Sequence, residues 1–124
     1  MDPSNVIELN AFVPARDFTL SKQFYSDLGF KLLWSSDDVA QFQIGAHTFL
    51  LQKFHVEEHS ANFMMALMVE DADAWWAHIQ RIDLAGKYTP HTLKPPTMQP
   101  WGLRVLYLTD PTGVLWHIQD RKRA

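Results

Sequence analysis

The order of the elements that the sequence predicts repeats once along the chain, and this repeat restricts the fold more than any other feature. Residues 7–13 alternate between apolar and polar types, which predicts a strand. Leu20, Phe24 and Leu28 then recur at every fourth position, and Gly29 follows them as a helix cap would. Three short apolar runs separated by turn-forming residues come next, at 30–34, 39–44 and 47–52. The first half therefore predicts the order β-α-β-β-β.

The second half begins with the same two elements. The apolar run at 63–69 predicts a strand. Asp71 is a good N-cap for a helix over 72–82, and Gly86 is expected to end that helix as Gly29 ends the first one.

The second half then continues with three more strands. A short strand is expected within 88–94, followed by an irregular loop because prolines occur at 95, 96 and 100. Residues 102–108 predict a further strand. The sequence DPTG places Asp, Pro and Gly where a type I turn favours them, so it reverses the chain into a last strand, VLWHIQ.

Two such modules predict a single α+β domain with internal pseudo-symmetry. Module 1 covers about 1–57 and module 2 about 58–124, and no Gly/Ser-rich linker separates them. With 124 residues, 47% of them hydrophobic and 20% charged, the chain is long and apolar enough to form a folded core.

Composition excludes several classes of function. The chain has no cysteine, which rules out disulfides, thiolate metal sites and thiol nucleophiles. We expect neither a signal peptide nor a membrane span, and therefore a cytoplasmic protein. A net charge of −3 with no basic stripe argues against nucleic acid as a partner. The acidic pairs Asp37-Asp38 and Glu57-Glu58 suit either a cationic ligand or solvated loops.

Three motifs in this order resemble the vicinal oxygen chelate superfamily, which contains glyoxalases, bleomycin-resistance proteins and dioxygenases. They are the RDF…FY..LGF helix, the Trp101-Gly102 pair before the seventh strand, and the DP.G hairpin before the eighth. The likeness covers nearly the whole chain and is greatest to the bleomycin-resistance-like branch.

The resemblance implies how the modules work together. Each module would curl its four strands into a cup, and two cups would enclose a cleft. Proteins of this size usually form homodimers with clefts shared between subunits. In the metal-dependent branch, side chains from the first and last strands converge on a divalent ion, and the matching positions in this chain are Glu8, Gln52, Met64 and His117.

The donors at these positions are poorly suited to a tightly bound metal. Glu8 and His117 are good ligands for Mn, Fe, Ni or Zn, and Gln52 can offer an oxygen. Met64 is a soft thioether with little affinity for these ions. We therefore expect no resident metal cofactor, with a weakly held divalent ion on Glu8, Gln52 and His117 as the alternative.

His117 poses the main question: it could be a metal ligand, a wall of the cleft or part of the core. Strand alternation places Trp116 and Ile118 on one face and His117 on the other, together with Leu115 and Gln119. Glu8, Asn10 and Phe12 share a similarly mixed face in the first strand. Because the more apolar face should contact the helices, His117 and Glu8 are expected to line the cleft.

Large apolar side chains complete the candidate site. Trp101 follows a proline-rich loop, and either stacks on a ligand or anchors that loop. Trp75, Trp76 and Trp116 are expected in the core, since they lie on a helix or on a strand face that contacts one. Further candidate pocket residues are aromatic or apolar and flexible: Phe12, Trp34, Met64, Ala66 and Met68.

Two functions remain at this point. The first is a binding protein that sequesters a small aromatic molecule, which could carry a positive charge, in the clefts of a homodimer. The second is a metal-dependent lyase, isomerase or dioxygenase, in which an ion polarises a substrate oxygen and Glu8 moves a proton. No motif supports a Ser-His-Asp system or a glycine-rich phosphate loop.

Overall fold

The computed structural model describes residues 1–122 and contains two four-stranded sheets, one from each half of the chain. After a short 3-10 helix (Pro3–Asn5), the first half contains β1 (Phe12–Pro14), α1 (Phe18–Leu28), β2 (Lys31–Ser35), β3 (Val39–Ile44) and β4 (His47–Gln52). The second half contains α2 (Glu57–Ala61), β5 (Met64–Met68), α3 (Ala72–Arg81), α4 (Leu84–Tyr88), β6 (Leu93–Met98), β7 (Arg104–Thr109) and β8 (Leu115–Asp120).

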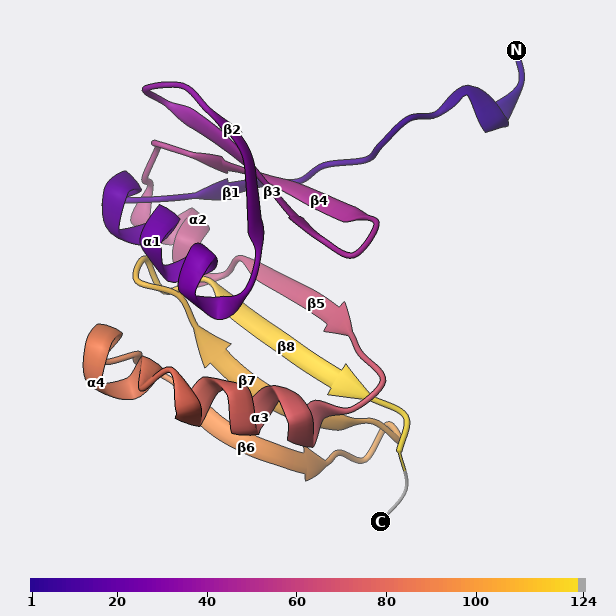
Figure 1. Cartoon of the computed structure of the whole chain (residues 1–124), viewed down its shortest axis with the longest axis vertical. Helices are drawn as coiled ribbons and strands as arrows, with labels where there is room; N and C mark the ends of the chain where they lie inside the picture. The colour runs from indigo at the N-terminus through magenta and orange to yellow at the C-terminus, as the bar shows by residue number, and fades with distance from the viewer. Residues whose placement is uncertain (123–124) are drawn as a thin grey trace.

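The two sheets have the same topology. Their strand orders are β1-β4-β3-β2 and β5-β8-β7-β6, with a parallel pair at the start of each and antiparallel pairs after it. Figure 1 shows α1 on the first sheet and α3 on the second, so each module is a sheet covered by a helix. The predicted α+β fold of two β-α-β-β-β modules is confirmed.

Local sequence signals account for most element boundaries. The Asp17 side chain accepts a hydrogen bond from the Leu20 N–H, and the Asp71 side chain does the same for the first turn of α3. Gly29 ends α1 with φ of 119°, a left-handed conformation that favours glycine. The Asp110 carboxylate in the DPTG turn accepts from three backbone N–H groups, those of Thr112, Gly113 and Val114.

The first strand is shorter than predicted. Alternation predicted a strand over 7–13, but β1 begins at Phe12, and the residues before it pair with no strand within residues 1–122. The residues before β1 do alternate between apolar and polar types, but a strand also needs a neighbouring strand to pair with. The pairing of β1 with β4 begins only at Phe12.

Gly86 does not end the second helix. α3 ends at Arg81, Asp83 then adopts a left-handed conformation, and Gly86 lies inside the next helix, α4. A Cβ at Gly86 would meet the Asp83 carboxylate, the end of a side chain that can move, so Gly86 is neither a helix cap nor a position that demands glycine.

The expected proline loop is largely a strand. β6 passes through Pro95 and Pro96, whereas the sequence predicted irregular structure there. Proline is compatible with this position because β6 is the edge of its sheet and its register with β7 shifts between Lys94 and Thr97.

One buried cluster joins the two modules. Trp116 of β8 packs against Phe30 and Phe49 of the first module, with ring centroids 5.5 and 5.6 Å apart. Its indole N–H donates to the Tyr25 hydroxyl, which donates in turn to the Asp110 carboxylate at 2.6 Å. Trp116 is thus a core residue as predicted, and it holds the helix-covered side of one sheet against the other.

Candidate functional site

The first sheet has one face that no helix covers. Cross-strand partners on this face run from Phe12 through Leu50 and Gln41 to Trp34, and Gln52 lies on the same side. Trp34 remains 48% exposed and Phe12 55% exposed. A sheet face that offers two large aromatic surfaces to solvent is typical of a ligand or partner site.

A chain of polar contacts crosses this open face. The Trp34 indole N–H donates to the Gln41 amide oxygen at 2.8 Å. The Gln41 amide N–H donates to the Glu8 carboxylate at 2.7 Å, and Asn10 donates to the same carboxylate oxygen at 3.1 Å. Gln41 therefore fixes both Trp34 and Glu8, and leaves the second Glu8 oxygen without a contact to these groups.

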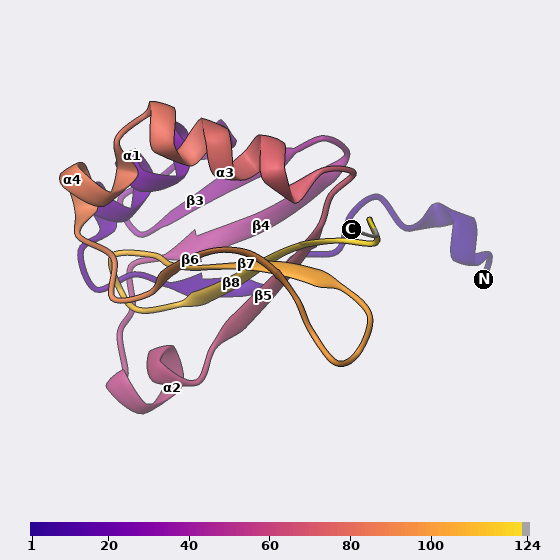
Figure 2. The ribbon, with the colours of Figure 1, turned by 90° about the horizontal axis from the view of Figure 1, so that it is seen from below.

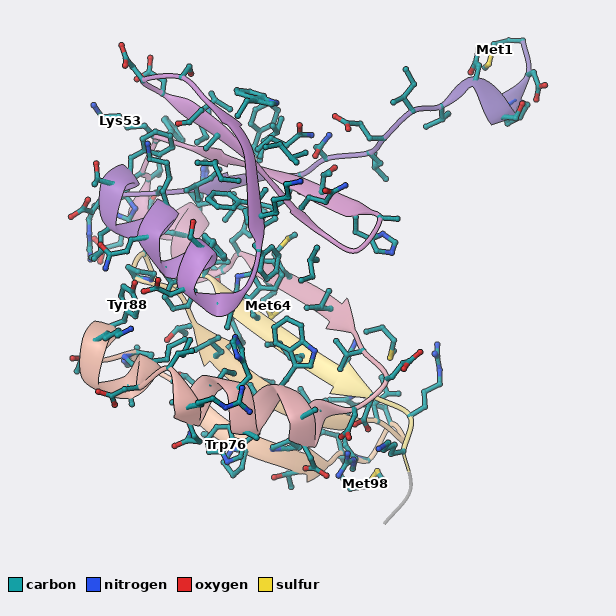
Figure 3. The ribbon with its side chains drawn as sticks, viewed as in Figure 1. Met1, Lys53, Met64, Trp76, Tyr88 and Met98 are labelled. Atoms are coloured by element: carbon teal, nitrogen blue, oxygen red, sulfur yellow. The ribbon has the colours of Figure 1, made fainter. Side chains whose placement is uncertain are left out.

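The second sheet has a matching open face. Cross-strand partners place Ala66, His117 and Tyr107 side by side, and Met64 and Met68 extend this face along β5. Both methionines are exposed, and Figure 3 shows Met64 at the level where the two modules meet. Flexible thioether side chains adapt to ligands of different shape.

His117 is the most unusual polar group of this face. Its ring lies edge-on to Tyr107, with centroids 4.9 Å apart. Its Nε2 atom is buried and has no hydrogen-bond partner within residues 1–122. Burial lowers the pKa of His117, so the imidazole is neutral at neutral pH. A buried ring nitrogen without a partner is unusual and makes His117 a candidate for contact with a ligand.

Trp101 lies in the turn between β6 and β7. Gln99 accepts from Gly102 at its carbonyl and donates to the Leu103 carbonyl, which closes a tight turn, and Gly102 has φ of 89°. Trp101 at its tip is 58% exposed. The indole is thus presented to solvent by a constrained backbone, in keeping with an anchor for a ligand.

The structure brings the predicted residues together in two groups and not in one. Glu8, Phe12, Trp34 and Gln52 belong to the first open face, and Met64, Met68 and His117 to the second. In the described part of the chain, no hydrogen bond or aromatic contact joins the two groups. No cluster of three or more His, Cys, Asp or Glu side chains with the spacing of a metal site occurs among these residues either. The assignment of the site residues stays a prediction.

Two residues that belong to these faces were missed at the sequence level. Gln41 and Tyr107 each occupy a central strand, where alternation shows which face they share. Their signal was a polar or half-polar side chain at every second position of an otherwise apolar run, as in VAQFQI and RVLYLT.

Comparison with known protein families identifies the fold family. The family model described as glyoxalase/bleomycin resistance protein/dioxygenase superfamily matches residues 8–118. The chain belongs to this superfamily. No curated protein sequence gives a significant match. None of the helices between residues 1 and 122 is long and apolar enough to cross a membrane.

Solved structures of this superfamily share the fold at low sequence identity. A bleomycin-binding protein in complex with bleomycin matches with a TM-score of 0.78 and 20% identity, over 94% of this chain and all of that chain. The bleomycin-binding protein from Streptomyces verticillus, complexed with copper(II)-bleomycin, gives 0.74 and 24%, over 91% of this chain and 96% of the other. Lactoylglutathione lyase from Agrobacterium tumefaciens gives 0.70 and 16%, over 96% of each chain. Binding proteins and an enzyme thus share this architecture.

Proposed function

We propose that the protein is a small-molecule binding protein that sequesters an aromatic compound, cationic or neutral, in the clefts of a homodimer. One observation carries the proposal: each open sheet face combines exposed aromatic or thioether surface with a well-placed polar group, Glu8 on one and His117 on the other. Pockets that bind drug-sized molecules have this composition.

The arrangement of the two faces supports the homodimer. In one chain the helix-covered sides share the aromatic core around Trp116, so the open faces cannot close over a ligand together. A second copy can place its second sheet opposite the first sheet of its partner. Two such clefts then form by symmetry, each with walls from both chains.

The Glu8 carboxylate favours a cationic ligand but does not require one. Glu8 holds a carboxylate beside the exposed ring of Trp34, with Gln41 between them. A planar cation could stack on the indole and pair with the free carboxylate oxygen. His117, neutral because burial lowers its pKa, would not repel such a ligand. We keep the cytoplasm as the location in this proposal, because the chain has no cysteine.

A metal-dependent lyase, isomerase or dioxygenase is the second candidate. Its support is the unpaired Nε2 of His117, which could coordinate an ion. The donor set fits poorly, because one Glu8 oxygen already accepts two hydrogen bonds and the fourth family position is Met64. When bound, an ion would polarise a substrate oxygen, with Glu8, Gln52 and His117 as its holders.

Replacing Trp101 by alanine is expected to weaken ligand binding by about 1 to 3 kcal/mol, because an exposed aromatic anchor is lost. The melting temperature should change little, since the indole is mostly outside the fold. Calorimetric titration of a ligand found by screening measures the first quantity. Met98→Ala, an exposed residue of the neighbouring strand, is the control. Equal affinity with reduced thermal stability would make Trp101 a packing residue only.

Changing His117 to asparagine is expected to weaken binding by about 1 to 3 kcal/mol, since a buried hydrogen bond to the ligand is altered. Metal content should stay unchanged, and binding should survive a chelator. His91→Asn, at an exposed histidine, is the matched control. Stoichiometric metal in the purified protein, lost in both His117→Ala and Glu8→Ala, would contradict this and favour the enzyme.

The experiment that tests the proposed function itself is a thermal-shift screen of planar aromatic compounds, supplied as pairs of cationic and neutral analogues. A true ligand should raise the melting temperature of the wild-type protein, and raise it less in the Trp101 and His117 variants. A panel in which no compound stabilises the protein, together with metal-dependent turnover, would disprove the binding role.

A further inference from the structure

A polar hollow opens at the end of the first module where α1 begins. Figures 1 and 2 show the start of α1 at the end of the molecule that lies opposite the N-terminal segment. The hollow has a volume of about 480 Å³ and is bordered by the first turns of α1, the turn that joins β2 to β3, and the residue that follows β4. None of its lining residues is among those assigned to the two open sheet faces, so it is separate from the candidate site described above.

Three cationic side chains from separate segments line this hollow. Arg16 precedes α1, Lys22 lies on the helix, and Lys53, which Figure 3 labels, directly follows β4. None of the three forms an ion pair with a carboxylate of residues 1–122, where the ion pairs are made by Arg104 and Lys122. Cations that gather without counter-charges repel one another, and an anion bound between them removes that repulsion.

Lys22 is held in place at the hollow by contacts that carry no negative charge. This side chain is half-buried, its ammonium donates to the Ser35 hydroxyl at 3.2 Å, and it lies 4.5 Å from the centre of the Phe18 ring. An ammonium has three N–H donors, so the bond to Ser35 leaves donors free for a ligand. A partly desolvated cation that is already oriented gains from an anionic partner.

Two carboxylates also border the hollow, and they restrict the kind of anion that fits. Asp17 accepts a hydrogen bond from the Leu20 N–H at 3.0 Å and so caps α1 itself, which means that the site depends on side chains and not on the helix terminus. Asp37 lies on the exposed turn between β2 and β3. Three cations against two carboxylates leave an excess of positive charge. This arrangement favours a small anion over a long polyanion such as nucleic acid, in keeping with the net charge of −3.

A phosphate group suits these donors better than a carboxylate does. Arg16 can donate two parallel N–H groups to one anion, and the ammonium groups of Lys22 and Lys53 come from other segments. A phosphate dianion has oxygen atoms for all three cations, whereas one guanidinium already satisfies a carboxylate. A phosphate group fills only part of a volume of about 480 Å³, so an attached organic group also has room.

We propose that this hollow binds phosphate, as the free ion or as the end group of a small ester, with Arg16, Lys22 and Lys53 as its cationic contacts. The site is distinct from the cleft that would hold the aromatic compound. It needs neither a homodimer nor an aromatic ligand, so it does not depend on the proposed function.

Titration followed by phosphorus NMR tests the site with two probes, inorganic phosphate and glycerol phosphate. Wild-type protein is expected to bind them saturably, and Arg16→Gln and Lys53→Gln should each raise the dissociation constant about tenfold, because a charge-assisted hydrogen bond is lost. Lys94→Gln, at an exposed lysine of β6, is the matched control and should bind as the wild type does. Tighter binding of glycerol phosphate identifies an ester as the ligand, and equal or weaker binding identifies the free ion. No saturation at millimolar probe, or one affinity in all variants, overturns the proposal.

Backbone amide chemical shifts locate the bound probe. The N–H signals of Thr19, Ser36 and Lys53 should move together as either probe is added, because these residues line the hollow. The signals of Ala66 and His117, on the second open face, should stay fixed. Shifts at the open face, or shifts scattered over the surface, overturn the assignment. Arg16 and Lys53 are exposed, so both variants should keep the wild-type circular dichroism, and neither probe is aromatic, so failure here is distinguishable from failure of aromatic ligand binding.

Discussion

Replacing Trp116 by alanine is expected to lower the free energy of unfolding by about 4 kcal/mol, the largest loss that we expect from a single aromatic residue here. Trp116 is buried, contacts Phe30 and Phe49, and donates to the hydroxyl of Tyr25. Truncation would leave a cavity between the modules and an unpaired Tyr25 oxygen. Urea unfolding followed by circular dichroism measures the effect.

Trp101→Ala is the matched control for this prediction, because it makes the same chemical change at an exposed position. It should alter the free energy of unfolding by no more than about 0.5 kcal/mol. Similar losses in both variants would show that the contact between modules around Trp116 does not dominate stability. A loss at Trp116 alone would instead identify this contact as the main link between the two halves.

The second large effect is expected at Asp120. This carboxylate is fully buried, accepts two hydrogen bonds from the Arg104 guanidinium, and accepts from the Ala72 N–H at the start of α3. Asp120→Ala should therefore cost about 3 kcal/mol of unfolding free energy, because it leaves a part-buried Arg104 and a helix N–H unpaired. Asp73→Ala is the control: Asp73 also pairs with Arg104 but is exposed, so its removal should cost less than about 1 kcal/mol.

Low pH should remove part of the stabilisation that the Asp120 carboxylate contributes. Hydrogen bonds from Arg104 are the main reason that the pKa of Asp120 lies well below its usual range. A carboxyl with a lowered folded pKa stabilises the protein above its unfolded pKa of about 3.9 and loses that contribution as the pH falls further. The difference in urea midpoint between wild type and Asp120→Ala should therefore be smaller at pH 3 than at pH 7. A gap that stayed constant would contradict this role for the Asp120 charge.

The face on which the strand residues of the candidate site lie could be predicted because strand alternation is a local property. Leu115, His117 and Gln119 share a face in any extended strand, whatever lies around them, and β8 has this alternating burial. Aromatic residues on the open first face followed from the same rule. The link from Trp34 through Gln41 to Glu8 could not be predicted this way, because these residues lie on separate segments and meet only when the sheet forms.

The sequence by itself determined the order of the strands and of the two longer helices, the caps at Asp71 and Gly29, and the face on which each strand residue lies. All three depend on residues within one or two turns of each other, such as Asp71 at the start of α3 and Gly29 at the end of α1. Only the tertiary structure decided which strands became edges. Among residues 1–122, that choice allows the prolines in β6, leaves residues 6–11 outside any strand, and leaves the outer edge of β5 open. Whether a strand lies at the edge of a sheet depends on segments that are distant in sequence, and the local residue pattern does not specify them.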